Sequence, residues 1–138
     1  MVTLSKAAPL NKIAVNLGIE RLGWGDGKSS LKLGVSKSHC NKAGVAHGGL
    51  YTMMLDMALG GALVSILPVE EWCATTQLNI SFISAAKPGE EIIATGKVVK
   101  RGKNVAHLAG DICVSSGRKI ATATGVWAIW DHKPDSMK

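Results

Sequence analysis

The sequence predicts a single α+β domain in which an antiparallel β-sheet is wrapped around one long central α-helix. The first observation is an apolar helical run over residues 49–66 that holds one charged side chain, Asp56. The second is a series of segments after residue 74 that alternate apolar and polar side chains and are separated by Pro-Gly and Gly-Lys turns. Because a sheet must cover its apolar face, and this is the only long apolar helix expected, the two should pack together.

The first third of the chain predicts a short helix and a β-hairpin. The helix covers residues 9–17, because a proline lies in its first turn, an apolar stripe follows and a glycine comes directly after it. Residues 19–24 and 30–36 have the pattern of strands. Asp26-Gly27 between them is typical of a tight hairpin turn.

The remaining two thirds predict a loop, the long helix and four strands. Residues 37–46 form a polar loop that leads into the helix, and Pro68 ends that helix. Four strands should follow as an antiparallel meander, over residues 74–84, 91–101, 104–115 and 119–131. The polar residues after 131 should form a frayed tail. A chain of 138 residues without a linker or repeat is expected to be one domain, with its core over about 19–131.

Composition limits the classes of function. The net charge is +6, but the basic residues are scattered over expected turns and strand ends without a nucleic-acid-binding motif, so we expect no nucleic acid partner. No apolar run is long enough to span a membrane, and the start of the chain lacks the features of a signal peptide, so we expect a cytoplasmic protein with no membrane association. Three widely spaced cysteines favour reduced thiols. The apolar content of 46% favours a homo-oligomer.

Asp56 is the most unusual residue of the pattern. It carries the only formal charge between Ala43 and Val69, which predicts a buried carboxylate on a buried helix. Burying an ionised carboxylate without partners is costly. Asp56 is therefore either a structural acceptor of hydrogen bonds, a residue on a less buried helix face, or a catalytic base or nucleophile in a cleft.

The residues around this helix resemble the hotdog-fold thioesterases, and in particular the PaaI-like branch of acyl-CoA thioesterases. The motif consists of Asn41, Gly44, the His47-Gly48-Gly49 turn, and Asp56 eight residues beyond Gly48. The resemblance continues through residues 78–82, 86–90 and 102–104 and covers roughly residues 30–131. It implies the hotdog fold, the hydrolysis of an acyl-CoA thioester and an active site at a dimer interface.

The resemblance also implies a role for each motif residue. Asp56 is implied as nucleophile or general base, the backbone N–H of Gly48 as the group that polarises the thioester carbonyl, and Asn41 as a positioning residue. Thr75 is implied as the strand hydroxyl that orients water, with Thr76 as a weaker alternative. His47 either transfers a proton directly or caps and positions the start of the helix.

Helix geometry independently favours a site shared by two subunits. The first N–H groups of a helix are free donors at the positive end of its dipole, so Gly48 can face a developing oxyanion. Asp56 lies about 10 to 12 Å further along the same helix, too far to act on the same carbonyl. Two antiparallel helices at a twofold axis would bring each Asp56 towards the partner's Gly48, which predicts a dimer or a dimer of dimers (a homotetramer) and an inactive monomer.

Two sets of residues are expected to contact the substrate, one at its acyl group and one at the phosphates of coenzyme A. Gly49 lets an acyl group approach without a Cβ in the way, and the helix side chains that are expected to line the acyl pocket are Leu50, Tyr51, Met53, Met54 and Met57. Coenzyme A carries phosphates, so basic side chains on exposed turns are candidates for binding them: Lys100, Arg101, Lys103 and Arg118.

Two alternative functions remain open. One is the hydration or dehydration of an enoyl thioester on the same fold, for which His39 or His47 would have to pair with a carboxylate. Another is a non-catalytic acyl-CoA-binding module, against which Asp56 argues because a pure binder would gain from an apolar residue there. A metal site at His39, Cys40 and His47 has no recognised ligand spacing, so we expect no metal and no cofactor apart from the coenzyme A of the substrate.

Overall fold

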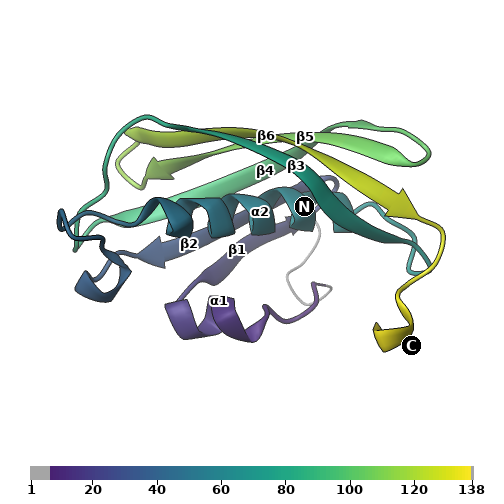
Figure 1. Ribbon diagram of the computed structural model, residues 1–138, viewed down its shortest axis with the longest axis horizontal. Coiled ribbons are helices and arrows are strands. Elements are labelled where there is room, and N and C mark those ends of the chain that lie inside the picture. The colour runs from purple at the N-terminus through teal and green to yellow at the C-terminus, as the bar shows by residue number, and fades with distance from the viewer. Residues whose placement is uncertain (1–6, 138) are drawn as a thin grey trace.

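The computed structural model describes residues 7–137 (Figure 1). It contains two α-helices, α1 (Lys12–Leu17) and α2 (Gly48–Val64), and two short 3-10 helices at Lys37–His39 and Asp135–Met137. The six strands are β1 (Glu20–Gly25), β2 (Lys28–Gly34), β3 (Trp72–Phe82), β4 (Glu91–Arg101), β5 (Val105–Val114) and β6 (Lys119–Trp130). No helix within residues 7–137 is long and apolar enough to cross a membrane.

All six strands form one antiparallel sheet in the order β1-β2-β4-β5-β6-β3, and the sheet curls around α2 (Figure 1). This arrangement confirms the predicted hotdog architecture of a sheet wrapped around a central helix. The predicted meander is wrong at one place, because β3 pairs with β6 rather than with β4. The edge of β4 is occupied by β2, so residues 83–90 cross from one side of the sheet to the other.

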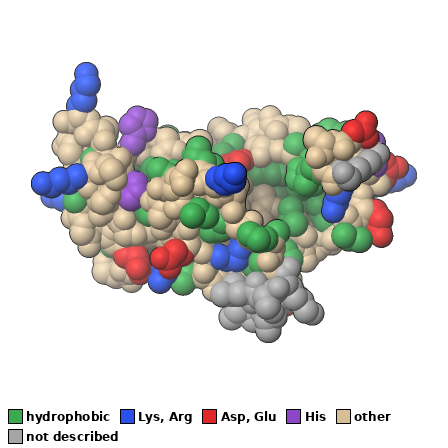
Figure 2. Space-filling model, turned by 90° about the horizontal axis from the view of Figure 1, so that it is seen from below, with side chains coloured by type: hydrophobic (Ala, Val, Ile, Leu, Met, Phe, Trp, Pro, Cys, Tyr) green, Lys and Arg blue, Asp and Glu red, His purple; other side chains and the backbone are tan. Residues whose placement is uncertain are grey.

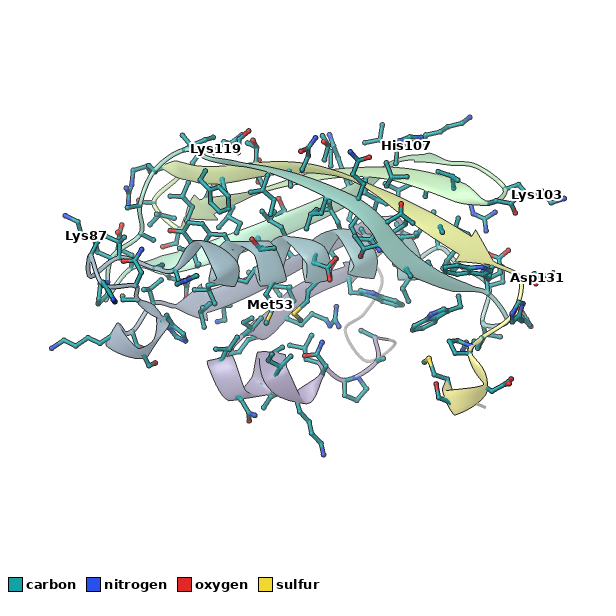
Figure 3. The ribbon with its side chains drawn as sticks, viewed as in Figure 1. Met53, Lys87, Lys103, His107, Lys119 and Asp131 are labelled. Carbon is teal, nitrogen blue, oxygen red and sulfur yellow. The ribbon has the colours of Figure 1, made fainter. Side chains whose placement is uncertain are left out.

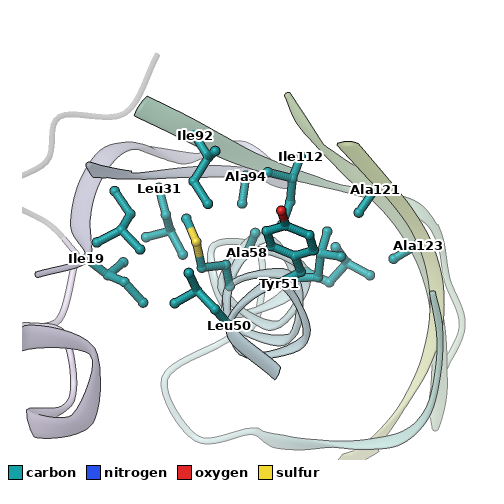
Figure 4. Close-up of a cluster of buried hydrophobic side chains, with 14 of the residues drawn as sticks. Ile19, Leu31, Leu50, Tyr51, Ala58, Ile92, Ala94, Ile112, Ala121 and Ala123 are labelled. Atoms are coloured by element: carbon teal, nitrogen blue, oxygen red, sulfur yellow. The ribbon is translucent and has the colours of Figure 1, made fainter. Parts of the chain in front are cut away.

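The core lies between α2 and the concave face of the sheet (Figure 4). Leu55, Ala58 and Leu59 of α2 are completely buried there. The helix approaches the sheet closely because its neighbours are small: a Cβ on Gly96 of β4 would lie 2.5 Å from the backbone oxygen of Ala58. A larger residue at 96 would therefore push α2 off the sheet.

Two local predictions concern the first third of the chain. The hairpin between β1 and β2 is confirmed: Asp26 and Gly27 both have positive φ values, 54° and 77°, as a tight turn of this kind requires. Helix α1 is shorter than predicted and begins at Lys12. The reason is Asn11, whose Oδ1 accepts a hydrogen bond from the Ala14 N–H at 2.9 Å and caps the helix.

The prediction of a buried helix holds for only one side of α2, and the less buried face that the sequence left open for Asp56 is what the structure has. One side of the helix is at least partly exposed, and we call it the open face; it consists of Thr52, Met53, Asp56, Met57, Gly60, Gly61 and Val64. Asp56 is consequently half-buried rather than buried. The open face lacks charge apart from Asp56, so the sequence pattern could not distinguish it from a core-facing side.

Candidate active site

The loop before α2 is closed by Asn41. Its Oδ1 accepts hydrogen bonds from the backbone N–H groups of Ala43 at 2.9 Å and Val45 at 3.4 Å. The backbone of Asn41 also bonds that of Val45 and accepts from Gly44. The side-chain oxygen thus braces the loop, and the amide NH2 group of this exposed residue stays available for a ligand.

His47 caps α2. Its Nδ1 accepts a hydrogen bond from the Gly49 N–H at 2.8 Å, and its backbone oxygen accepts from Leu50 at 2.9 Å. An accepting Nδ1 requires the neutral ring with the proton on Nε2. This geometry matches the capping and positioning role, one of the two that the sequence left open for His47.

Gly48 holds the free donor at the start of α2. The N–H groups of Gly49 and Leu50 are both satisfied by His47, whereas that of Gly48 has no hydrogen-bond acceptor among residues 7–137. The ring of Phe82 lies against the Gly48 backbone, since a Cβ added to Gly48 would be 3.2 Å from Phe82 Cε1. Phe82 is 57% exposed, so the donor and the ring together form an accessible surface at the positive end of the helix.

Asp56 pairs with Thr75 of β3, the residue that was expected to orient water. The Thr75 hydroxyl on β3 donates a hydrogen bond to Asp56 Oδ1 at 2.6 Å. The buried residue Cys73 lies near the same carboxylate. Burial raises the pKa of its thiol to about 11, and the negative charge of Asp56 contributes to this increase. Cys73 is therefore a protonated neighbour of the site and not a nucleophile at neutral pH.

A β-bulge in β3 decides which threonine meets Asp56. The pairing of β3 with β6 shifts register between Thr75 and Gln77 and leaves Thr76 without a partner residue. The Thr76 hydroxyl instead donates to the backbone oxygen of Val126 at 2.9 Å. In a regular strand Thr76, and not Thr75, would lie on the same face of the sheet as Leu78, which faces the core. Because Thr76 is the extra residue of the bulge, Thr75 faces the helix instead.

The two halves of the candidate site lie towards opposite ends of β3. Gly48 contacts Phe82, the last residue of the strand, whereas Asp56 bonds Thr75 near its beginning. Along α2, Gly48 and Asp56 are about 12 Å apart. A single chain therefore presents an oxyanion donor and a carboxylate that do not face one common carbonyl.

The residues expected to line the acyl pocket fall into two groups. Leu50, Tyr51 and Met54 belong to the core of the single chain, where the Tyr51 hydroxyl accepts a hydrogen bond from the Ala86 N–H at 3.0 Å. Met53 and Met57 lie on the open face and are half-buried. Only the second group is accessible to a ligand without a rearrangement of the core.

The basic residues expected to bind phosphates are far from Gly48 in the same chain. Lys103 lies at the far end of the sheet, opposite the end that carries Lys87 (Figure 3), and Lys100 and Arg101 are the last two residues of β4, just before it in the chain. Arg101 is paired with Glu71, and Lys100 and Lys103 are exposed. Arg118 lies at the same end of the sheet as Gly48, but it forms a bidentate ion pair with Glu90 and donates to the Ala85 oxygen.

Both ring nitrogens of His39 form hydrogen bonds within the chain. Its Nδ1 accepts from the Ser36 N–H at 3.0 Å, and its Nε2 bonds the Leu17 oxygen at 2.7 Å, which ties α1 to the loop before α2. Within residues 7–137, no three His, Cys, Asp or Glu side chains gather closely enough to hold a metal ion. A groove of about 660 Å³ is lined mainly by residues of β1, β2, β4 and β5 and does not include Gly48 or Asp56.

Sequence reasoning missed Phe82 as a site residue. It was treated as one of the alternating apolar residues of a strand, and only the fold reveals that its ring meets the start of α2. The sequence signal for Phe82 was weak: it is the only phenylalanine of the chain and the last apolar residue of the alternation Leu78, Ile80, Phe82.

Comparison with known proteins places the chain in a family. Residues 43–121 match the family model described as the thioesterase superfamily. Mouse acyl-coenzyme A thioesterase 13 is 32% identical over 90 residues, which are 63% of this chain, and the match spans 62% of the mouse protein.

Two solved structures share the fold. The E. coli PaaI protein from the phenylacetic acid degradation operon superposes with a TM-score of 0.80 at 21% identity, covering 86% of this chain and 83% of that one. A hypothetical thioesterase protein from Streptococcus pneumoniae, solved with coenzyme A, superposes with a TM-score of 0.76 at 24% identity over 84% of this chain and 88% of that one. Both likenesses confirm the fold expected from the sequence.

Proposed function

The chain belongs to the thioesterase superfamily, and from this membership together with the geometry of the site we propose that it hydrolyses acyl-CoA thioesters to a free acid and coenzyme A. The acyl-CoA class is supported by the mouse relative, which is named an acyl-coenzyme A thioesterase, and by the S. pneumoniae structure with coenzyme A. Coenzyme A is then part of the substrate, and the proposed reaction needs no cofactor.

The reaction begins at Gly48. The thioester carbonyl oxygen accepts a hydrogen bond from the free Gly48 N–H, and the positive end of α2 stabilises the negative charge that grows on this oxygen. Asp56 either removes a proton from a water that attacks the carbonyl carbon, or attacks this carbon itself and forms an acyl anhydride that water then hydrolyses. Thr75 holds the carboxylate in place. The carbon–sulfur bond breaks, coenzyme A leaves as a thiolate that takes up a proton, and the oxygen of water ends in the acid.

We propose that Gly48 and Asp56 of one active site come from two subunits. Strand β3 is an edge of the sheet, and among residues 7–137 it pairs only with β6. If β3 pairs antiparallel with the β3 of a second copy, the Asp56–Thr75 end of one strand lies beside the Gly48–Phe82 end of the other. The half-exposed inner side chains of β3 and the open face of α2 would then be covered by the partner. The proposed protein is a homodimer or a dimer of such dimers.

The observation that carries the proposal is the Thr75–Asp56 hydrogen bond at 2.6 Å on a helix whose first N–H is unpaired. The test follows free thiol release from a panel of short, medium, long-chain and aryl CoA thioesters, for the parent and for Asp56→Asn. We expect hydrolysis of at least one class and a loss of more than about a hundredfold in kcat/KM in the variant. A variant within a few-fold of the parent on the best substrate would disprove the role of Asp56.

The same panel addresses the other two candidate functions. Hydration of an enoyl-CoA without any thiol release would favour a hydratase, although His39 is unavailable for it because both ring nitrogens are engaged. Binding of acyl-CoA without turnover of any kind would favour a binding module. No observation in the structure favours either over hydrolysis.

A further inference from the structure

An exposed aromatic ring lies beside the free backbone donor of α2. Phe82, the last residue of β3, is 57% exposed, and Ile83 directly after it is 55% exposed. Exposed apolar side chains that lie together are common at binding surfaces. The three atoms nearest to a Cβ added on Gly48 all belong to the Phe82 ring, at 3.2, 3.7 and 3.8 Å. The ring therefore covers one side of Gly48.

Contacts within the chain hold this ring in place. It stacks on Tyr51 of α2, with ring centroids 6.2 Å apart and an interplanar angle of 27°. Tyr51 belongs to the buried cluster of Figure 4, and its hydroxyl accepts a hydrogen bond from the Ala86 N–H at 3.0 Å. The backbone of Phe82 is fixed as well, because it pairs with Ala121 of β6. The ring is thus positioned before any substrate binds.

A substrate that binds at Gly48 must lie close to this ring. The Gly48 nitrogen is separated by two bonds from the position of the added Cβ, and a carbonyl oxygen accepts from such a nitrogen at about 2.9 Å. The carbonyl carbon is then next to a ring that a single Cβ would already crowd. Space beside the reacting carbon is therefore limited on the side of Phe82.

The two substituents of the carbonyl carbon differ in how much they vary between substrates. On the coenzyme A side, every thioester presents the same sulfur and the same unbranched CH2 group. On the acyl side, the width next to the carbonyl depends on whether the first carbon is branched. A fixed ring at this place consequently distinguishes acyl groups by branching at the first carbon.

The rest of the acyl chain has an apolar surface to follow. Met53 and Met57 on the open face of α2 are half-buried and accessible. Figure 2, which shows the molecule from below, has hydrophobic side chains over much of its middle, where they border a hollow. The contact with Phe82 is confined to the start of the acyl group, so it restricts the width of that group there and leaves its length free.

We propose that Phe82 is a specificity-determining residue that contacts the substrate beside the oxyanion donor, so that the preferred substrates are CoA thioesters whose acyl group is unbranched at the carbon next to the carbonyl. Tyr51 is a positioning residue that holds the Phe82 ring in place. This inference rests on the proposed function and specifies the substrate class of the same site.

The test uses two isomers that differ only in the place of one methyl group. For the best straight-chain substrate from butyryl-CoA upwards, kcat/KM is measured for its 2-methyl and 3-methyl derivatives, in the parent and in Phe82→Ala. One methyl group in a tight site changes kcat/KM by about 10- to 200-fold. We expect the parent to prefer the 3-methyl isomer at least about tenfold, and Phe82→Ala to reduce this preference to about threefold or less. The lower intrinsic reactivity of the 2-methyl isomer is the same with both proteins and cancels in the comparison.

Ile83→Ala is the matched control. It removes an apolar side chain of similar exposure one position away, which is not among the atoms nearest to Gly48. It should leave the preference between the isomers unchanged, and an equal change in both alanine variants would refute a specific role of Phe82. Because Phe82 is exposed in the single chain, Phe82→Ala should fold normally, which circular dichroism verifies.

Two variants of Tyr51 test its positioning role. Tyr51→Phe keeps the ring that stacks on Phe82 and should keep the preference for the 3-methyl isomer. Tyr51→Leu removes that ring and should weaken the preference, a ratio that does not depend on the amount of folded protein. An unchanged ratio in Tyr51→Leu would refute the positioning role.

The outcomes separate this inference from the proposed function. Equal kcat/KM for the two isomers in the parent would overturn the specificity role of Phe82 and leave the thioesterase proposal standing. An unchanged preference in Phe82→Ala, including an equal loss on both isomers, would overturn it too. If the parent hydrolyses no thioester, the proposed function fails, and the dissociation constants of the two intact isomers are compared instead. The same ratio of these constants in the parent and in Phe82→Ala would then refute the inference.

Discussion

Replacing Thr75 by valine tests the partnership at the centre of the candidate site. Valine keeps the shape of threonine and removes the hydroxyl that donates to Asp56 Oδ1 at 2.6 Å. Hydrogen bonds to charged groups contribute about 1.5 to 3 kcal/mol. Thr75 is exposed in the single chain, so water can partly replace the lost donor and the lower value applies. About 1.5 kcal/mol corresponds to a loss of roughly tenfold in kcat/KM.

The neighbouring residue supplies the control. Thr76→Val makes the same chemical change one position away, but the Thr76 hydroxyl donates to the Val126 backbone and does not touch Asp56. Thiol release is measured for the parent, both valine variants and Thr75→Ser, with circular dichroism to verify folding. Thr75→Ser should retain most of the activity because it keeps the donor. Equal activity of Thr75→Val and the parent, or an equal loss in Thr76→Val, would refute the reasoning.

Three further predictions concern the surroundings of the site. His47→Ala should lower the free energy of unfolding by about 1 kcal/mol, because α2 loses its N-cap, whereas His47→Asn should restore it in urea unfolding; equal stability of the two variants would contradict capping. The Lys87 backbone N–H, and then Arg118, hold the pKa of Glu90 below its ordinary 4.5, so Glu90 contributes stability above that pH that is lost as the pH falls through the lowered pKa. Glu90→Gln should therefore flatten the acid side of the melting-temperature profile, and an unchanged profile would argue against it. Burial raises the pKa of Cys73 from 9.0 to about 11, so at pH 8 its thiolate should be about a hundredfold scarcer than that of an ordinary cysteine, and rapid alkylation in the folded protein would contradict this.

The parts of the fold that sequence predicted well are set by local patterns. The boundaries of β4 agree completely with the prediction, because an alternating segment lies between a Pro-Gly and a Gly-Lys turn. The hairpin at Asp26-Gly27 follows from residues that tolerate positive φ. The place of β3 at the edge of the sheet could not be predicted in this way. It arises because β2, and not β3, pairs with β4, and β2 and β4 are distant in sequence.

The site shows the same division between local and distant information. The capping of α2 by His47 involves a residue two positions away and was one of the two roles considered. Arg101 was expected to bind a phosphate of coenzyme A, but it forms an ion pair with Glu71. The two residues are 30 positions apart in the sequence, so no local pattern predicts this pair. The bulge at Thr76 has no signature in the alternation of apolar residues, and yet it determines which hydroxyl reaches Asp56.

The central claim is that one active site is assembled from two subunits, and mixed dimers test it most directly. Asp56→Asn removes the carboxylate, and Gly48→Val obstructs the oxyanion donor with a Cβ that would lie 3.2 Å from Phe82 Cε1. Each variant alone should be inactive. In a dimer that contains one chain of each kind, one of the two sites has both an intact Asp56 and an intact Gly48.

Co-expression of the two variants with different tags yields the mixed dimer, and thiol release is compared with each variant alone. With random assortment, about half of the dimers are mixed and about half of their sites are intact, so the account predicts recovery of about a quarter of the parent activity. Activity no greater than that of the separate variants, in a preparation in which the mixed dimer has been isolated through both tags, would show that Gly48 and Asp56 act within one chain.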